Sequence, residues 1–168
     1  MNKALFLDRD GVVNIEINYL YKIEDFKFVD GIFELCKKYQ NQGYLIFIVT
    51  NQSGIARGYY TQEAFDILSS WMVEEFAKHG ITIQKVYFCP HHPEISGACS
   101  CRKPNAGMLF DAQKEFNVDL ENSILVGDKE SDIEASLVAG IKNSYLFDEH
   151  HIYVKSKATK IVSKLEEI

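Results

Sequence analysis

Short apolar segments alternate along this chain with segments whose apolar residues recur at helical spacing. The apolar segments predict strands at Ala4–Leu7, Tyr44–Val49, Val86–Phe88, Ile124–Val126 and Ser144–Phe147. The periodic segments predict helices from Ile32 to Gly43, from Thr61 to Gly80, and at Gly107–Phe116 and Ile133–Val138. Because such alternation needs right-handed crossovers, it predicts an α/β fold: a Rossmann-like parallel sheet with helices on both faces.

Two segments do not follow the alternation. Residues Gly11 to Asp30 contain several aromatic side chains but no helical period, which predicts a packed loop. The tail from Lys157 is ambiguous, because Ile161 and its apolar neighbours allow a helix, whereas Lys160–Val162 allows a short strand.

Size and charge narrow the classes of protein. A chain of 168 residues with no repeat or flexible linker predicts one domain, 1–168, and is too short for a large cap domain. The net charge of −6 argues against a nucleic-acid or membrane-surface partner, and no apolar run is long enough to span a bilayer. Met1 leads directly into the first predicted strand without a secretory signal, so we expect a cytoplasmic protein, with a monomer as the default.

Two acids follow the first predicted strand. Asp8 and Asp10 are two residues apart, so their carboxylates can lean to the same side of the strand. Like charges this close need a shared proton or a bound cation. With Mg²⁺ bound, one carboxylate can attack phosphorus while the other handles the proton of the leaving group. The alternative is a strand that ends in an ordinary acidic turn.

Polar residues also follow the other predicted strands, and a parallel sheet brings these ends to one edge. They are Thr50-Asn51-Gln52-Ser53, Arg102-Lys103 and Gly127-Asp128-Lys129, with Asp132 further on. Asp8 and Asp128, with the backbone carbonyl of Asp10, could bind Mg²⁺, while Thr50 and Lys103 could contact phosphoryl oxygens. Individually, Thr50 could cap a strand, Lys103 could be solvated and Asp128 could cap a helix. Together they favour phosphoryl transfer.

A third cluster lies in the loop after Val86–Phe88. Cys89, His91, Cys99 and Cys101 offer three thiolates and an imidazole, which suits a closed, structural Zn²⁺ site. A Cys99–Cys101 disulfide is the alternative, and both geometry and a reducing cytosol disfavour it. Catalytic zinc is a further alternative, but four protein ligands leave no open position. Bound zinc would order the loop and aim the Arg102 and Lys103 side chains at the substrate.

With these motifs the chain resembles the haloacid-dehalogenase (HAD) superfamily phosphatases. More narrowly it resembles the D-glycero-D-manno-heptose-1,7-bisphosphate 7-phosphatases, through Thr50–Gly58, Cys89–Pro93 and Cys99–Pro104. The resemblance implies that Asp8 is the nucleophile and forms an aspartyl-phosphate, and that Asp10 is the general acid and base. It also implies Mg²⁺ at Asp8, Asp10 and Asp128, a supporting role for Asp132, and His91 rather than His92 as the zinc ligand.

The resemblance further implies a sugar bisphosphate substrate and a role in nucleotide-activated heptose synthesis for cell-surface polysaccharide such as lipopolysaccharide. The substrate-binding residues it implies are Glu16, Asn18, Tyr19, Asn51, Gln52, Ser53, Arg102 and Lys129. Arg102 and Lys129 suit a second anionic group, and Arg57 could join them or pair with a surface carboxylate. Histidinol-phosphate phosphatases share the acid pair and the cysteine loop, so that activity is the alternative. A zinc-containing binding module without activity is the second alternative. The preferred anomer is left open.

Overall fold

The computed structural model describes residues 1–168 and contains one six-stranded sheet. Its strands are β1 (Ala4–Leu7), β2 (Leu45–Asn51), β3 (Ile83–Cys89), β4 (Ile124–Gly127), β5 (Asn143–Phe147) and β6 (Lys160–Val162). They lie in the order β3-β2-β1-β4-β5-β6, and every neighbouring pair is parallel. The chain therefore builds the sheet outward from β1 in one direction and then returns to add β4 on its other side.

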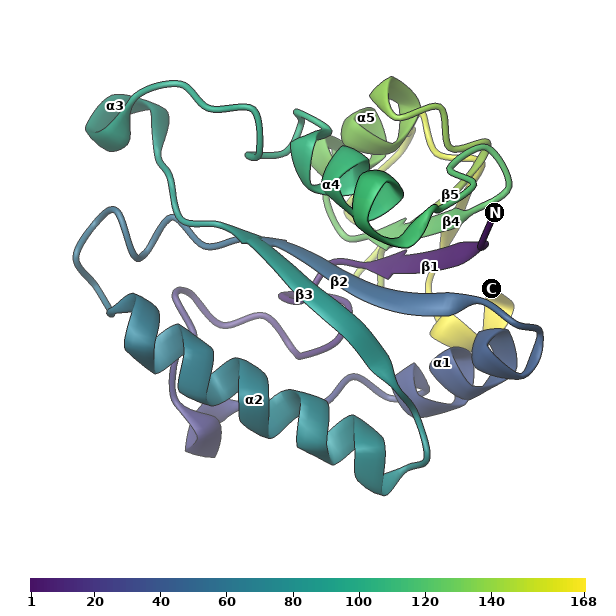
Figure 1. The fold of residues 1–168 in the computed structure, drawn as a ribbon, viewed down its shortest axis with the longest axis horizontal. Helices are drawn as coiled ribbons and strands as arrows, with labels where there is room; N and C mark the ends of the chain where they lie inside the picture. Colours follow the sequence, from purple (N-terminus) through teal and green to yellow (C-terminus); the bar gives the residue numbers. More distant parts are fainter.

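Helices cover both faces of this sheet. The α-helices are α1 (Ile32–Asn41), α2 (Gln62–Lys78), α3 (Pro93–Ser96), α4 (Gly107–Phe116) and α5 (Glu130–Val138), and two 3₁₀ turns span Ile23–Asp25 and Leu165–Glu167. Figure 1 shows α1 and α2 on one side of the sheet and α4 and α5 on the other. No helix combines the length and the apolar character that crossing a bilayer would need. The predicted fold class is confirmed, and no separate cap domain covers the sheet.

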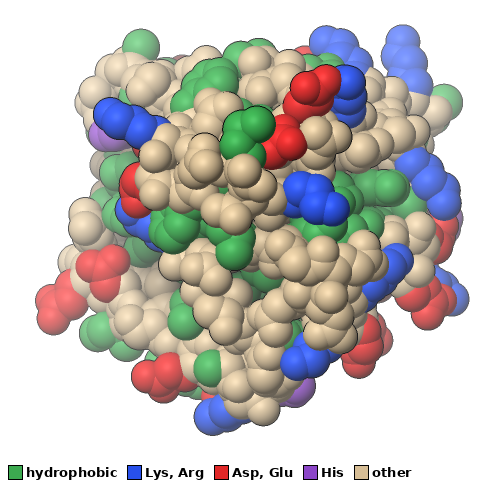
Figure 2. All heavy atoms as spheres, turned by 45° about the vertical axis from the view of Figure 1, so that its right-hand side comes forward, with side chains coloured by type: hydrophobic (Ala, Val, Ile, Leu, Met, Phe, Trp, Pro, Cys, Tyr) green, Lys and Arg blue, Asp and Glu red, His purple; other side chains and the backbone are tan.

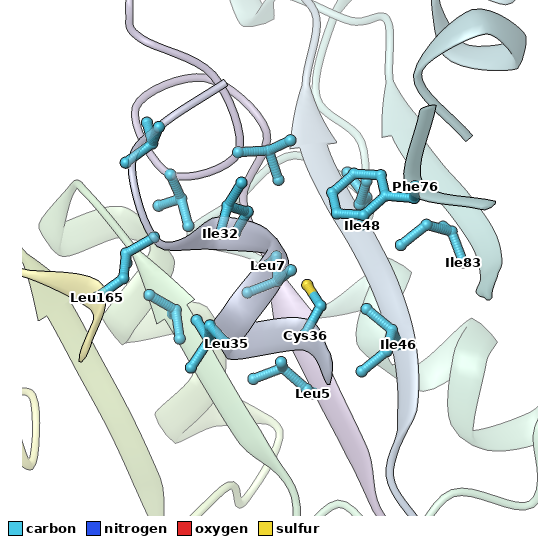
Figure 3. Packing of buried hydrophobic residues seen from close by; sticks show 14 of the residues in the cluster. Leu5, Leu7, Ile32, Leu35, Cys36, Ile46, Ile48, Phe76, Ile83 and Leu165 are labelled. Carbon is cyan, nitrogen blue, oxygen red and sulfur yellow. The ribbon is translucent and has the colours of Figure 1, made fainter. Parts of the chain in front are cut away.

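The core consists of two apolar layers that share the central strands. Leu5 and Leu7 of β1 pack with Ile46 and Ile48 of β2 beneath α1, as Figure 3 shows. The alternate residues of the same strands, such as Phe6 and Phe47, point to the α4 side. Strands buried on both faces read as continuous apolar runs, which is why β1 and β2 stand out in the sequence.

Some boundaries differ from those predicted. Helix α5 starts at Glu130, three residues before Ile133, because the Asp132 carboxylate accepts hydrogen bonds from the backbone N–H groups of Asp128 and Lys129 and so caps the first turn. In the tail, the strand at Lys160–Val162 is the alternative that forms, since it pairs with β5. Strand β3 also extends further toward its amino end than Val86.

The carboxyl ends of the strands meet at one edge, which lies on the left in Figure 1 together with the loops after β2 and β3. Ligands on parallel sheets bind at this edge, where the strand order reverses. Here the reversal lies between β1 and β4. Figure 2 brings the right-hand side of Figure 1 forward, and on that face Lys and Arg side chains are interspersed with Asp and Glu.

Candidate active site

Lys103 and Asp8 meet at the carboxyl end of β1. The Lys103 ammonium lies 2.9 Å from Asp8 Oδ1 and 2.6 Å from Asp132 Oδ1, and it donates to the Val49 carbonyl at 2.8 Å. Lys103 is only 5% exposed, so it is not a solvated surface lysine. Burial alone would lower the pKa of Lys103, but the carboxylates of Asp132 and Asp8 raise it, which keeps the ammonium charged.

Asn51 fixes the backbone of Lys103. The Lys103 N–H donates to Asn51 Oδ1 at 3.0 Å, and Asn51 Nδ2 donates to the Lys103 carbonyl at 3.1 Å. These paired bonds join the loop after β2 to the end of the cysteine loop. The ammonium group is therefore placed by two loops at once.

Three carboxylates gather where β1 and β4 end. Oxygens of Asp8, Asp128 and Asp132 lie within 4.8 Å of one another. Burial and the neighbouring acids raise the pKa of Asp8 and, more strongly, of Asp128. Asp128 Oδ1 is buried and has no hydrogen-bond partner. An orphaned carboxylate oxygen among clustered acids fits a divalent cation that prefers oxygen ligands.

Gly11 makes this cluster sterically feasible. A Cβ atom at Gly11 would lie 2.1 Å from Asp128 Oδ2, and its φ of +90° also favours glycine. The carboxylate of Asp128 thus rests directly against the backbone of the turn that carries Asp8 and Asp10. Asp132 differs from the other two acids because both of its oxygens already accept protein hydrogen bonds or contact Lys103.

Asp10 points away from the acid cluster. Its carboxylate accepts hydrogen bonds from Arg9, from Asn14 Nδ2 at 3.1 Å and from Gln52 Nε2 at 3.0 Å. The guanidinium of Arg9 contacts both Asp10 oxygens and is 1% exposed. The Asp10 side chain is therefore not one of the clustered carboxylates that could bind a cation, but it lines the cavity described next.

A cavity of about 470 Å³ opens above Asp8 and Asp10. All eight residues expected to bind substrate line it: Glu16, Asn18, Tyr19, Asn51, Gln52, Ser53, Arg102 and Lys129. Thr50 does not line it. The Thr50 hydroxyl is fully buried and accepts a hydrogen bond from Gln52 Nε2 at 2.9 Å. The structure thus brings the expected residues together around one opening and places Thr50 behind them.

The cysteine cluster also forms as expected. Sγ of Cys89 lies 3.6 Å from Sγ of Cys99, and Nδ1 of His91 lies 3.5 Å from Cys89 Sγ and 3.3 Å from Cys101 Sγ. The ligand edges of a tetrahedral zinc site are about 3.5–3.8 Å. The Cys89–Cys101 separation of 2.6 Å is shorter than such an edge, yet all four cysteines are free thiols. The set of donors fits zinc.

Two features in and beside the cysteine loop were not expected from the sequence. It contains a helical turn, α3, which begins at Pro93, a residue that suits the first turn of a helix. Arg57 neither lines the cavity nor pairs with a carboxylate: its guanidinium lies 2.8 Å from His92 Nε2 and 5.9 Å from the centre of the Tyr19 ring. His92 lies outside the cluster, and His91 is the histidine that lies with the cysteines.

Two residues at the site gave no separate signal in the sequence. Arg9 sits inside the acid motif and is easily passed over as the spacer between two acids. Tyr60 is distant from that motif, and its hydroxyl donates to Gln52 Oε1. No periodicity marks such a contact, because it depends on how the loop after β2 folds back on itself.

Comparison with known proteins gives consistent findings. A family model described as polynucleotide kinase 3 phosphatase matches residues 7–164. A Campylobacter jejuni protein named D-glycero-alpha-D-manno-heptose-1,7-bisphosphate 7-phosphatase is 56% identical over 147 residues, covering 88% of this chain and 83% of that protein. A Yersinia pestis protein named D-glycero-beta-D-manno-heptose-1,7-bisphosphate 7-phosphatase is 46% identical over 148 residues, covering 85% of this chain and 79% of that protein.

A solved structure agrees with these relatives. The D,D-heptose 1,7-bisphosphate phosphatase from B. bronchiseptica, complexed with magnesium and phosphate, superposes with a TM-score of 0.85 at 28% identity. The match covers 97% of this chain and 93% of that one.

Proposed function

Because the chain belongs to the polynucleotide kinase 3 phosphatase family of HAD-type phosphatases, we propose that it removes the 7-phosphate of D-glycero-D-manno-heptose 1,7-bisphosphate. The observation that carries the chemistry is the buried contact between Lys103 and Asp8 at the base of the cavity. The sugar is proposed from the names of relatives such as the Campylobacter jejuni protein.

Asp8 and Asp10 divide the reaction between them. An Asp8 oxygen attacks phosphorus, the bond between phosphorus and the sugar oxygen breaks, and that oxygen takes a proton from Asp10. Asp10 then removes a proton from water, which attacks the aspartyl-phosphate and releases inorganic phosphate with the Asp8 carboxylate restored. The same side chain is thus first acid and then base.

Charge on the phosphoryl oxygens is offset by Lys103. Asp8, Asp128 and the backbone of Asp10 would hold Mg²⁺, which supplies further positive charge between nucleophile and phosphate. Asp132 orients Lys103 and the backbone around Asp128 and need not bind the cation itself. We assign Thr50 to a supporting position, because its buried hydroxyl reaches Gln52.

The remaining cavity residues would bind the sugar and its second phosphate. Arg102 and Lys129 supply positive charge, and Glu16 and Asn18 offer hydrogen bonds to sugar hydroxyls. Burial would lower the pKa of Lys129, but Glu16 and Asp128 raise it, so the ammonium stays charged.

The four free thiols suit a reducing compartment, and we propose a monomer acting in the cytoplasm with zinc ordering the cysteine loop.

The test is phosphate release with Mg²⁺ from both anomers of the heptose bisphosphate and from histidinol phosphate, with Asp8→Asn as the blank. Turnover of a heptose bisphosphate is expected, and Asp8→Asn should abolish it. The preferred anomer would assign the substrate, since the relatives named above differ in it. Turnover of histidinol phosphate alone would overturn the substrate and keep the mechanism. No turnover of any ester would overturn the activity.

A further inference from the structure

The orientation of the Asp10 carboxylate is set by its neighbours. Arg9 contacts both oxygens, and Asn14 donates to Oδ1. Gln52 Nε2 donates to Oδ2 at 3.0 Å. Rotation of the carboxylate is therefore opposed at both ends, and the Oδ2 end depends on which way the Gln52 amide faces.

Tyr60 decides which way that amide faces. The Tyr60 hydroxyl donates to Gln52 Oε1, so Nε2 is left to donate to Asp10 Oδ2 and to Thr50 Oγ1. A flipped amide would place its carbonyl oxygen against the Asp10 carboxylate and its NH₂ group against the tyrosine hydroxyl. The first contact would be repulsive, and burial makes it more costly because Gln52 is only 2% exposed.

The ring of Tyr60 is itself held by packing. It stacks on the Tyr21 ring with centroids 5.5 Å apart, and it lies so close to Gly54 that a Cβ there would be 2.2 Å from Tyr60 Cε1. Tyr60 is 7% exposed. The hydroxyl is thus placed by the packing of its ring against Tyr21 and Gly54.

We propose that Tyr60 is a positioning residue for the proton-transfer step, acting through Gln52 on Asp10. The inference rests on the proposed function, in which Asp10 protonates the departing sugar oxygen. Removing the hydroxyl takes away the hydrogen bond that holds the Oε1 end of the Gln52 amide, so the amide can shift and weaken its bond to Asp10 Oδ2, which then keeps only its contact with Arg9. The defect should therefore appear only when the leaving oxygen needs a proton.

The experiment compares Tyr60→Phe with wild type on two esters. One is the heptose bisphosphate, whose sugar alkoxide must be protonated as it leaves, and the other is p-nitrophenyl phosphate, whose phenolate leaves without a proton. The ratio kcat/KM is measured because it reports only on steps up to and including the first irreversible one. It therefore does not include hydrolysis of the aspartyl-phosphate. We expect a loss of about fivefold on the sugar ester, as for one hydrogen bond, and less than about twofold on the aryl ester.

Three controls make the outcome decisive. Tyr87→Phe removes a hydroxyl from an equally buried tyrosine, also 7% exposed, on β3 and should change neither ratio. In a Gln52→Ala background, Tyr60→Phe should add no further loss. Asp10→Asn should show the same preference for the aryl ester in a stronger form.

The outcomes separate the two proposals. Equal losses on both esters for Tyr60→Phe, or no loss, would overturn the positioning role, as would full additivity with Gln52→Ala. If Asp10→Asn itself loses equally on both esters, the assignment of Asp10 as the acid fails and the positioning role of Tyr60 fails with it, whereas failure of the proposed function would show as no turnover of the heptose bisphosphate by the wild type.

Discussion

At the scale of single residues, the balance of charge around Lys103 is the feature that organises the site. The ammonium group contacts the buried carboxylates of Asp8 and Asp132, and the half-buried carboxylate of Asp128 lies beside them, so three ionised acids would leave a charge deficit of two. A divalent cation would remove that deficit, and a monovalent one would not. Asp128 is the acid of this group with an unpartnered oxygen, because both oxygens of Asp132 are already taken by backbone N–H groups and by Lys103.

Asp148 allows a prediction that does not depend on metal. Burial would raise the pKa of Asp148, but the backbone N–H groups of Tyr153 and Ile152, which donate to its two oxygens at 2.8 and 2.9 Å, lower it. Because the pKa of Asp148 is lower in the folded state, its carboxylate stabilises the fold at pH values above the ordinary pKa of Asp. This stabilisation is lost as the pH falls through the pKa of the folded state. At pH 7, Asp148→Asn should lower the Tm by about 3 °C, corresponding to ~1 kcal/mol.

Thermal unfolding of both proteins across pH checks this prediction. The difference in Tm should be constant from neutral pH down to about pH 5 and shrink below about pH 4, where the wild-type carboxylate takes up its proton. A difference that grows on acidification would contradict it.

Residue identities were the part of the site that sequence could supply. Asp8, Lys103 and the cavity residues all follow strands, and parallel strands bring their ends together regardless of loop detail. Thr50 lies behind the cavity because β2 continues past Val49 to Asn51, whereas the positions of Arg57 and Tyr60 depend on how the loop after β2 folds back. No periodicity or motif in the sequence indicates such contacts, so they are recognised only in the folded structure.

At the scale of elements, the cysteine loop is the part whose order we expect to depend on bound zinc. Its ends are anchored by Cys89 at the end of β3 and by Lys103 on Asn51, and between them lies only the short helix α3. Removing zinc from the holoprotein with a chelator should loosen residues 90–101 and lower kcat/KM by about tenfold or more, because Lys103 loses its placement.

Amide hydrogen exchange of the loop tests the prediction, with the zinc content of each sample measured in parallel. Cys99→Ser should reproduce the effect of chelation. Cys36→Ser is the matched control, since that thiol belongs to α1 and is buried in the apolar layer on the other face of the sheet from Cys89. Full activity in a sample verified to be free of zinc would contradict the role given to the metal.

At the scale of the whole molecule, two apolar layers share one sheet and should unfold together. Ile46 faces the α1 side and Phe47 the α4 side of the same strand. Ile46→Ala should cost ~2–5 kcal/mol and Phe47→Ala ~3–5 kcal/mol of unfolding free energy. If residues 1–168 form one domain, both variants should shift a single cooperative transition in calorimetry.

Two separate transitions, or a variant that shifts only part of the signal, would contradict a single domain.

The fold class itself followed from the alternation of strands and helices. The strand order did not, because alternation is equally compatible with a chain that adds each strand on the same side. The reversal between β1 and β4 had to be seen.

The central position of β1 has a consequence for the growing chain. Asp8 leaves the ribosome 95 residues before Lys103, the residue that supplies its ammonium partner, and β4 follows later still. Until then Asp8 has neither β4 beside it nor its counter-charge. The arrangement around Asp8 can therefore form only after the nascent chain has been made as far as β4.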